Sequence, residues 1–219
     1  MKTEAVIFDM DGVLVDSEWF IAEAARMMFA ETHGAEVKHE DFLPFVGRGE
    51  NLFLGGVAEK YGIGSFDVER DKARTYAIFI EIVRGKLKEL PGASAFVAAC
   101  RKKGLKTALA TSTDRIKMEA NLREIGLDGD AFMARVNGLD VERKKPFPDI
   151  FLEAARRIGA EADSCWVVED STSGVKAAKA AGMRCLALLT TFPESELRAA
   201  GADAITKDLS TADIGVFGD

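Results

Sequence analysis

The amino-acid sequence predicts an α/β protein with a parallel sheet and an inserted helical unit. Three observations support this fold class. Residues 5–8 form an apolar run that ends abruptly in acidic residues, which is typical of a buried strand. Residues 17–88 have apolar side chains at helical spacing and contain no convincing strand. From residue 91 onward, predicted helices and strands alternate, and this alternation indicates a parallel sheet.

The first part of the chain supplies one strand and then only helices. A strand is predicted over residues 4–9, and Ser17 is a good N-cap for the helix that follows it. Apolar side chains recur at helical spacing after Ser17. Further helices are predicted over residues 50–61 and 66–88, separated by glycines that interrupt the helical pattern.

The second part of the chain alternates helical patterns with short apolar runs. In chain order the predicted elements are helix 93–103, strand 105–110, helix 114–125, strand 133–137, helix 148–158, strand 164–168, helix 173–181, strand 184–189, helix 194–200 and strand 203–206. The first strand has no partner of its own nearby, so we expect it to join this later sheet. The expected architecture is a Rossmann-like core of residues 1–16 and 89–219 with an inserted all-helical cap domain of residues 17–88.

Composition restricts the compartment and the class of partner. With 47% hydrophobic residues the chain can bury a core, and its net charge of −7 argues against a nucleic-acid or anionic-membrane surface. No apolar run reaches the roughly 18 residues of a membrane helix. The three cysteines lack metal-ligand spacing and are expected to be reduced core residues. We therefore expect a cytoplasmic protein with no nucleic-acid and no membrane partner.

Two aspartates follow the first strand directly, at positions 9 and 11. Two acids at the end of a buried strand repel each other, and burial penalises their charged forms. A bound cation or an unusual protonation state is therefore expected, although an acidic turn without function is an equal alternative for this motif alone. An EF-hand loop does not fit, because Val13 stands where that loop requires an oxygen ligand.

Polar side chains also follow three later strands of the predicted sheet. They are Thr111 and Ser112, then Lys145, and then Glu169 with Asp170. In an open parallel sheet, ligands bind at the carboxyl ends of the strands. Taken singly, the hydroxyls could end a strand or cap a helix, and the lysine could belong to a solvated basic turn. Together, the carboxylates suit a hard divalent cation and the other groups suit phosphate oxygens, which indicates phosphoryl chemistry.

These motifs resemble the four motifs of the haloacid dehalogenase-like superfamily. The matching stretches are Asp9-Met10-Asp11-Gly12-Val13, Thr111-Ser112, Lys145-Pro146-Phe147-Pro148-Asp149 and Glu169-Asp170-Ser171. Their order along the chain is that of the superfamily. The surrounding stretches resemble the branch that contains beta-phosphoglucomutase and sugar-phosphate phosphatases, and residues 17–88 resemble the helical cap of that branch.

The resemblance implies a role for each matching residue. Asp9 would be the nucleophile that forms an aspartyl-phosphate, and Asp11 would be the general acid and base. The resemblance implies Mg²⁺ held by the Asp9 carboxylate, the Asp11 backbone carbonyl and Asp170, with Glu169 as a further ligand. The residues that it places around the transferred phosphoryl group are Asp9, Met10, Asp11, Thr111, Ser112 and Lys145.

The substrate implied is a small phosphorylated metabolite, and a sugar phosphate is preferred. Arg48, in a glycine-flanked loop of the cap, is a candidate contact to the leaving group, and a solvated turn is an equal alternative. The mutases of this branch carry a histidine in the first cap helix, where this chain reads Trp19-Phe20-Ile21, and an arginine where it has Glu50. A phosphatase is therefore preferred to a beta-phosphoglucomutase-type mutase. A non-enzymatic phospho-acceptor module is less favoured, because it would not need the helical insertion or Asp11.

Overall fold

The computed structural model describes residues 2–45 and 49–218. Its centre is a six-stranded sheet in the order β3-β2-β1-β4-β5-β6, and every neighbouring pair is parallel. The strands are β1 (Ala5–Phe8), β2 (Lys106–Ala110), β3 (Ala134–Val136), β4 (Cys165–Glu169), β5 (Arg184–Leu188) and β6 (Ala204–Thr206). The first strand joins this sheet, as the sequence predicts, and lies between β2 and β4. The Rossmann-like α/β class is therefore confirmed.

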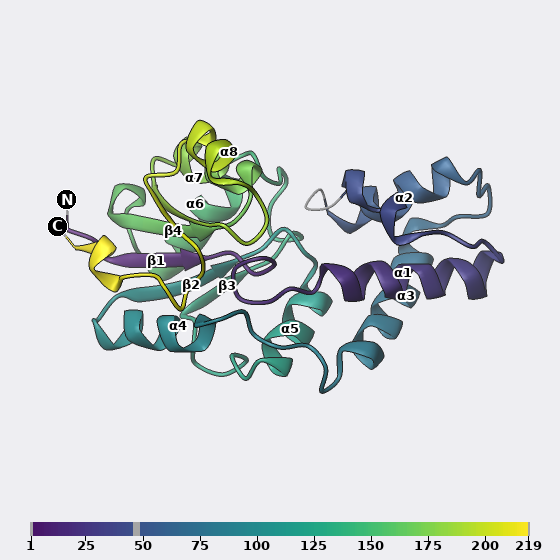
Figure 1. Cartoon of the computed structure of the whole chain (residues 1–219), viewed down its shortest axis with the longest axis horizontal. Coiled ribbons are helices and arrows are strands. Elements are labelled where there is room, and N and C mark those ends of the chain that lie inside the picture. The colour runs from purple at the N-terminus through teal and green to yellow at the C-terminus, as the bar shows by residue number, and fades with distance from the viewer. Residues whose placement is uncertain (1, 46–48, 219) are drawn as a thin grey trace.

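Helices cover both faces of this sheet. Figure 1 shows α4 and α5 on one face and α6, α7 and α8 on the other. Their bounds are α4 (Ala93–Lys102), α5 (Arg115–Glu124), α6 (Asp149–Ile158), α7 (Thr172–Ala180) and α8 (Glu194–Ala200). Because side chains alternate along a strand, Val6 and Phe8 pack into one buried cluster while Ala5 and Ile7 pack into the other. Burial on both faces explains why β1 is a continuous apolar run.

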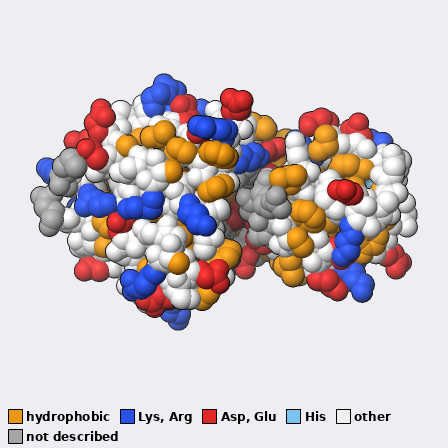
Figure 2. Space-filling model, turned by 90° about the horizontal axis from the view of Figure 1, so that it is seen from above, with side chains coloured by type: hydrophobic (Ala, Val, Ile, Leu, Met, Phe, Trp, Pro, Cys, Tyr) orange, Lys and Arg blue, Asp and Glu red, His pale blue; other side chains and the backbone are white. Residues whose placement is uncertain are grey.

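Three more helices form a second body beside the sheet, which we call the helical unit. They are α1 (Glu18–His33), α2 (Glu50–Lys60) and α3 (Val68–Val83), with short 3₁₀ turns at His39–Asp41 and Leu43–Phe45. Figure 2 shows a waist between this body and the larger one. The helix expected over residues 66–88 is shorter than predicted. Asp67 caps its start by accepting from the Arg70 N–H at 2.8 Å, and Gly85 (φ +67°) takes a left-handed conformation just after its end.

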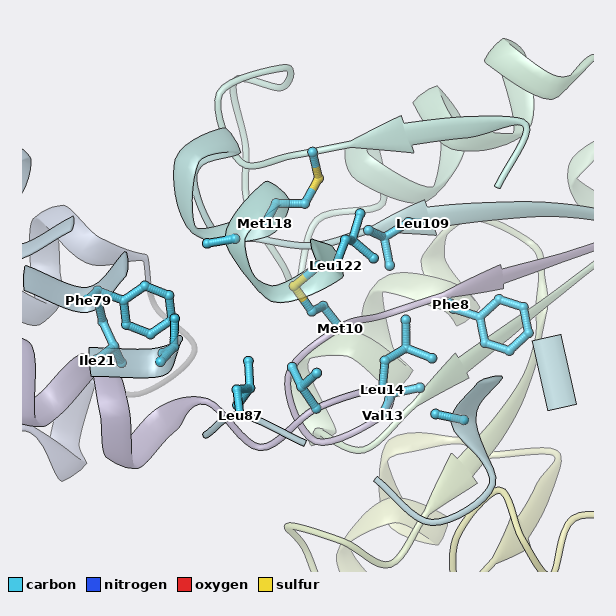
Figure 3. Close-up of a cluster of buried hydrophobic side chains, with 14 of the residues drawn as sticks. Phe8, Met10, Val13, Leu14, Ile21, Phe79, Leu87, Leu109, Met118 and Leu122 are labelled. Atoms are coloured by element: carbon cyan, nitrogen blue, oxygen red, sulfur yellow. The ribbon is translucent and has the colours of Figure 1, made fainter. Parts of the chain in front are cut away.

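The two chain segments that join the helical unit to the sheet lie side by side. The Leu90 N–H donates to the Leu14 carbonyl oxygen at 2.8 Å, and Val15 forms an antiparallel bridge with Glu89. Buried apolar side chains continue from the sheet past these segments into the helices, from Leu14 to Leu87 and Phe79 (Figure 3). The entry and exit of the helical unit are therefore anchored next to the carboxyl end of β1.

The structure contradicts one expectation about single residues, the Ser17 cap, and confirms another, the buried cysteines. Ser17 occupies the N-cap position of α1 but makes no side-chain capping bond, because its hydroxyl donates to Asp11 instead. Cys100, Cys165 and Cys185 are buried free thiols, as expected. Among residues 2–45 and 49–218, the helices are too short or too polar to cross a bilayer.

Candidate active site

The carboxyl ends of four adjacent strands, β3, β2, β1 and β4, meet at one end of the sheet, beside the helical unit. Asp9 follows β1, Thr111 follows β2, Lys145 lies on the loop after β3, and Glu169 ends β4 with Asp170 next. These residues line a cavity of about 450 Å³, together with Asp11 and Ser112. The parallel sheet thus brings together side chains that are up to 161 positions apart in the sequence.

Asp9 and Glu169 are held by one lysine. The Lys145 ammonium donates to Asp9 Oδ1 at 2.6 Å and to Glu169 Oε1 at 2.5 Å. The side chains of Lys145 and Glu169 are almost fully buried, and Asp9 is 7% exposed. The second oxygen of Glu169 accepts from the Asp170 and Ser171 N–H groups, both at 2.8 Å. Asp9 therefore has a fixed orientation with one carboxylate edge directed at the ammonium group.

Burial and mutual repulsion shift the pKa values of these groups. Burial raises the pKa of Asp9 to about 7, and the charge of Glu169 adds to this against the opposing charge of Lys145. Burial, with the charges of Glu169 and Asp9, raises the pKa of Asp170 well above its usual value. Burial alone would raise the pKa of Glu169, but the charge and hydrogen bond of Lys145 outweigh it and lower that pKa. One lysine is therefore too little positive charge for three buried carboxyl groups.

The same three carboxyl groups are suited to hold a divalent cation. Asp9, Glu169 and Asp170 each offer an oxygen, and these oxygens lie within 4.8 Å of one another. Asp170 also accepts a hydrogen bond from the Thr191 hydroxyl. A side chain at Gly12 (φ +80°) would place its Cβ 1.8 Å from Asp170 Oδ2, so only glycine leaves room for this carboxylate. The all-oxygen donor set and the surplus negative charge fit a hard cation such as Mg²⁺.

Asp11 has different partners from Asp9. Its carboxylate accepts from the Ser17 hydroxyl and from the Lys117 ammonium at 2.9 Å. Burial would lower the pKa of Lys117, but the charges of Asp11, Glu18 and Glu50 outweigh it and raise that pKa. Two carboxylates in one cavity therefore have separate environments, which is a common arrangement for an acid and a nucleophile with different tasks.

The residues expected around a phosphoryl group differ in how they face the cavity. Thr111 and Ser112 line it, and the Ser112 hydroxyl is buried without a hydrogen-bond partner among the described residues. The side chain of Met10 instead packs in the buried cluster near Leu122 (Figure 3), so only its backbone is available to a ligand. Arg48 lies outside the described residues.

Sequence reasoning missed several polar groups of this site. Lys117, Glu50 and Thr191 all line the cavity. None of them is the first polar residue after a predicted strand, so the pattern of polar residues at strand ends does not indicate them. Lys117 carries a weak signal, because it shares the buried face of α5 with Asn121, and a lysine there requires a partner.

Comparison with known proteins identifies the family. A model of the haloacid dehalogenase-like hydrolases matches residues 3–182. The chain belongs to this family. The expected family membership is therefore confirmed.

Individual relatives of this haloacid dehalogenase-like hydrolase vary in length. The chain is 44% identical over 215 residues to Protein SUPPRESSOR OF QUENCHING 1, chloroplastic, from Arabidopsis thaliana, matching 97% of this chain but only 20% of that protein. It is 35% identical to the phosphorylated carbohydrates phosphatase of Thermotoga maritima, with 93% and 94% covered. A crystal structure of a hydrolase from Pseudomonas syringae superimposes with a TM-score of 0.79 at 28% identity, with 95% of each chain covered.

The raised pKa of Asp9 predicts a pH-dependent effect of Asp9→Asn on stability. An unfolded aspartate ionises near 3.8, but Asp9 in the folded protein ionises near 7. The folded state therefore holds this proton more tightly, so the contribution of Asp9 to stability falls as the pH rises from about 4 to about 7. Asparagine does not ionise. We therefore compare the free energy of unfolding of Asp9→Asn with that of wild type in the absence of divalent cations. This difference should shift in favour of Asp9→Asn by on the order of 1–3 kcal/mol as the pH rises from 5 to 8.

Urea unfolding in chelator at several pH values measures this difference. The exposed Asp163→Asn, at the other end of β4, is the matched control and should show no such trend. A difference between Asp9→Asn and wild type that stays constant with pH would contradict the burial argument.

Lys117 is predicted to be a large contributor to folding stability. Its side chain is 3% exposed, and its ammonium group neutralises the charge of the Asp11 carboxylate. The Glu18 Oε1 lies 3.9 Å from the same ammonium group. Removing one partner of a buried ion pair typically costs about 3–5 kcal/mol, since the other charge is left without compensation. We expect a loss of this size for Lys117→Met and less than about 0.5 kcal/mol for Lys176→Met on the exposed face of α7. Equal unfolding free energies for the two variants would rule out this role.

Proposed function

We propose that this hydrolase is a Mg²⁺-dependent phosphatase that acts on a small phosphorylated metabolite, a sugar phosphate or similar ester, through an aspartyl-phosphate. The observation that supports this most is the cluster of Asp9, Lys145, Glu169 and Asp170 at the carboxyl end of β1 and β4, open to the cavity. A relative that is a phosphorylated carbohydrates phosphatase supports the substrate class.

In the first half of the proposed reaction, an Asp9 oxygen attacks phosphorus and the bond from phosphorus to the leaving oxygen breaks. Asp11, which lines the same cavity and would enter this step protonated, gives its proton to that leaving oxygen. Lys145, Thr111 and the Ser112 backbone amide would bind the phosphoryl oxygens, where each well-placed donor typically contributes about 3 kcal/mol to the transition state. The fixed orientation of Asp9 by Lys145 serves this step, because the attacking oxygen must be aligned with phosphorus.

In the second half, Asp11 takes a proton from water, and that water displaces the phosphate from Asp9. The leaving alcohol and inorganic phosphate are then the products. The Asp9 and Asp170 carboxylates and the Asp11 backbone carbonyl would hold Mg²⁺, with Glu169 close by. When bound, Mg²⁺ would neutralise the repulsion between Asp9 and the phosphate dianion. The side chains of Ile21, Leu43 and Phe53 from the helical unit also line the cavity and would limit the access of water.

We further propose that the helical unit acts as a cap that opens and closes at the two adjacent linkers, residues 13–17 and 85–92. These segments are the connections between the sheet and the helices, and they are paired with each other through Val15 and Glu89. Hinges of this kind are a few residues at element ends that absorb the change in backbone angles.

The proposed function is tested by phosphate release from a panel of small phosphomonoesters, with Mg²⁺ and with chelator. Mg²⁺-dependent release that is lost in Asp11→Asn for esters with poor leaving groups is the expected result. Conversion of beta-glucose 1-phosphate to glucose 6-phosphate without phosphate release would support the mutase alternative instead. Phosphorylation of the protein without any turnover would support the phospho-acceptor alternative. The expected cytoplasmic location and the expected lack of nucleic-acid and membrane partners stay predictions.

A further inference from the structure

Glu50 reaches the candidate active site from the helical unit. It is the first residue of α2, yet its Oε1 accepts a hydrogen bond at 2.5 Å from Thr113, which lies just beyond Thr111 and Ser112 in the loop after β2. Both Glu50 and Thr113 line the cavity. The carboxylate is therefore fixed near the end of the cavity that faces the helical unit, where the alcohol part of a phosphate ester must lie.

The second oxygen of this carboxylate has no hydrogen-bond partner among the described residues. Glu50 is 7% exposed, and its Oε2 is fully buried. A buried carboxylate oxygen without a donor costs free energy, because it has lost its water and gained nothing in return. Because Glu50 also lines the cavity, this carboxylate is suited to accept a hydrogen bond from a ligand.

The charge around Glu50 indicates which ligand groups are compatible with it. Asp16 and Glu18 line the same cavity, and burial together with the charges of Asp11, Glu50 and Asp16 raises the pKa of Glu18 to about 7 against the opposing charge of Lys117. The two lysines lining the cavity among the described residues are each paired with acids, Lys145 with Asp9 and Lys117 with Asp11. A second anionic group on the substrate would meet repulsion here.

We propose that Glu50 is a specificity residue of the leaving-group end, and that it accepts a hydrogen bond from a hydroxyl or ammonium group of a substrate whose phosphate is its only anionic group. This inference rests on the proposed phosphatase function and narrows its substrate class. Glycerol phosphate-like polyol esters and phosphoethanolamine-like esters satisfy the condition. Bisphosphates and phosphorylated carboxylic acids do not.

Substrate panels on full-length variants test the proposal. The probes are glycerol 3-phosphate, phosphoethanolamine, fructose 1,6-bisphosphate, phosphoglycolate and p-nitrophenyl phosphate, which has no hydrogen-bond donor in its leaving group. Wild type should have at least about tenfold higher kcat/KM for one of the first two esters than for either compound with a second anionic group. Glu50→Ala should lower that kcat/KM at least about tenfold more than it lowers the value for p-nitrophenyl phosphate.

A second variant distinguishes the two donor groups. Glu50→Gln keeps a carbonyl oxygen as acceptor but removes the charge. A hydroxyl-bearing ester should therefore keep most of its kcat/KM in Glu50→Gln. An ammonium-bearing ester should instead show a kcat/KM in Glu50→Gln that is as low as in Glu50→Ala, because its hydrogen bond depends on the charge. Either pattern supports the proposal.

A purely structural role of Glu50 would give a different result. The Trp166 indole N–H is a suitable comparison, because it is also buried without a hydrogen-bond partner among the described residues and does not line the cavity. If Glu50→Ala and Trp166→Phe both lower kcat/KM by one common factor for all probes, or if wild type prefers a bisphosphate or phosphoglycolate, the proposal is overturned. If no probe releases phosphate from wild type, the proposed function itself fails, which is a distinguishable outcome.

Discussion

Asp9→Asn is expected to lower the rate of phosphate release by roughly 10³-fold or more while the protein stays folded. Asparagine has nearly the same shape as aspartate but is not a nucleophile, so no aspartyl-phosphate can form. The neighbouring Lys145 and Glu169 keep their mutual contact at 2.5 Å, so the rest of the site should retain its arrangement. Release measured under saturating substrate and Mg²⁺ isolates the chemical step from binding.

The control for this prediction is Asp163→Asn, which removes an exposed acid far from the cavity and should keep full activity. Circular dichroism and the unfolding midpoint establish that Asp9→Asn is folded. A folded Asp9→Asn protein that retains more than a tenth of the wild-type rate would show that Asp9 is not the nucleophile.

Removal of divalent cations is expected to reduce phosphate release by at least about 10²-fold, because several kcal/mol of charge stabilisation are lost. Asp9 and Asp170 both have raised pKa values without a cation, which means that their ionised forms are unfavourable in that state. Addition of Mg²⁺ should restore the rate. It should also stabilise the folded protein, by about 2.7 kcal/mol at a concentration 100 times its dissociation constant.

Asp170→Asn separates a metal-binding role from a general effect of ions. This variant keeps an oxygen next to Thr191 but removes one charge from the three-carboxyl cluster. We expect it to need at least about tenfold more Mg²⁺ for half-maximal rate and for the same thermal stabilisation. Full activity of wild type in chelator, or identical Mg²⁺ dependence of Asp170→Asn and wild type, would contradict the proposed cation site.

The part of the fold that sequence reasoning predicts best is the sheet. Buried parallel strands are short apolar runs between amphipathic helices, and this pattern is local. Asp9, Thr111 and Glu169 were identified because each stands at the end of such a run. Once the strands are parallel neighbours, their carboxyl ends must meet, so the site follows from the topology.

Contacts that helices make at the strand ends were not predictable in this way. Lys117 and Asp11 are separated by 106 positions, and Thr113 and Glu50 by 63. Neither pair lies in a repeating pattern that fixes its distance in space. The packing of α5 and α2 over the strand ends determines these contacts, so they emerge only from tertiary structure. The same is true of Ser17, whose hydroxyl bonds to Asp11 rather than to its own helix.

The central claim is that Asp9 carries the phosphoryl group during turnover, and the mass of the peptide containing Asp9 tests it most directly. Asp11→Asn should be mixed with p-nitrophenyl phosphate, whose good leaving group needs no acid, and quenched in acid. The account predicts one p-nitrophenolate released rapidly per protein, slow turnover afterwards, and one phosphoryl group on Asp9. Steady release of phosphate with the Asp9 peptide unmodified at every time point would contradict it.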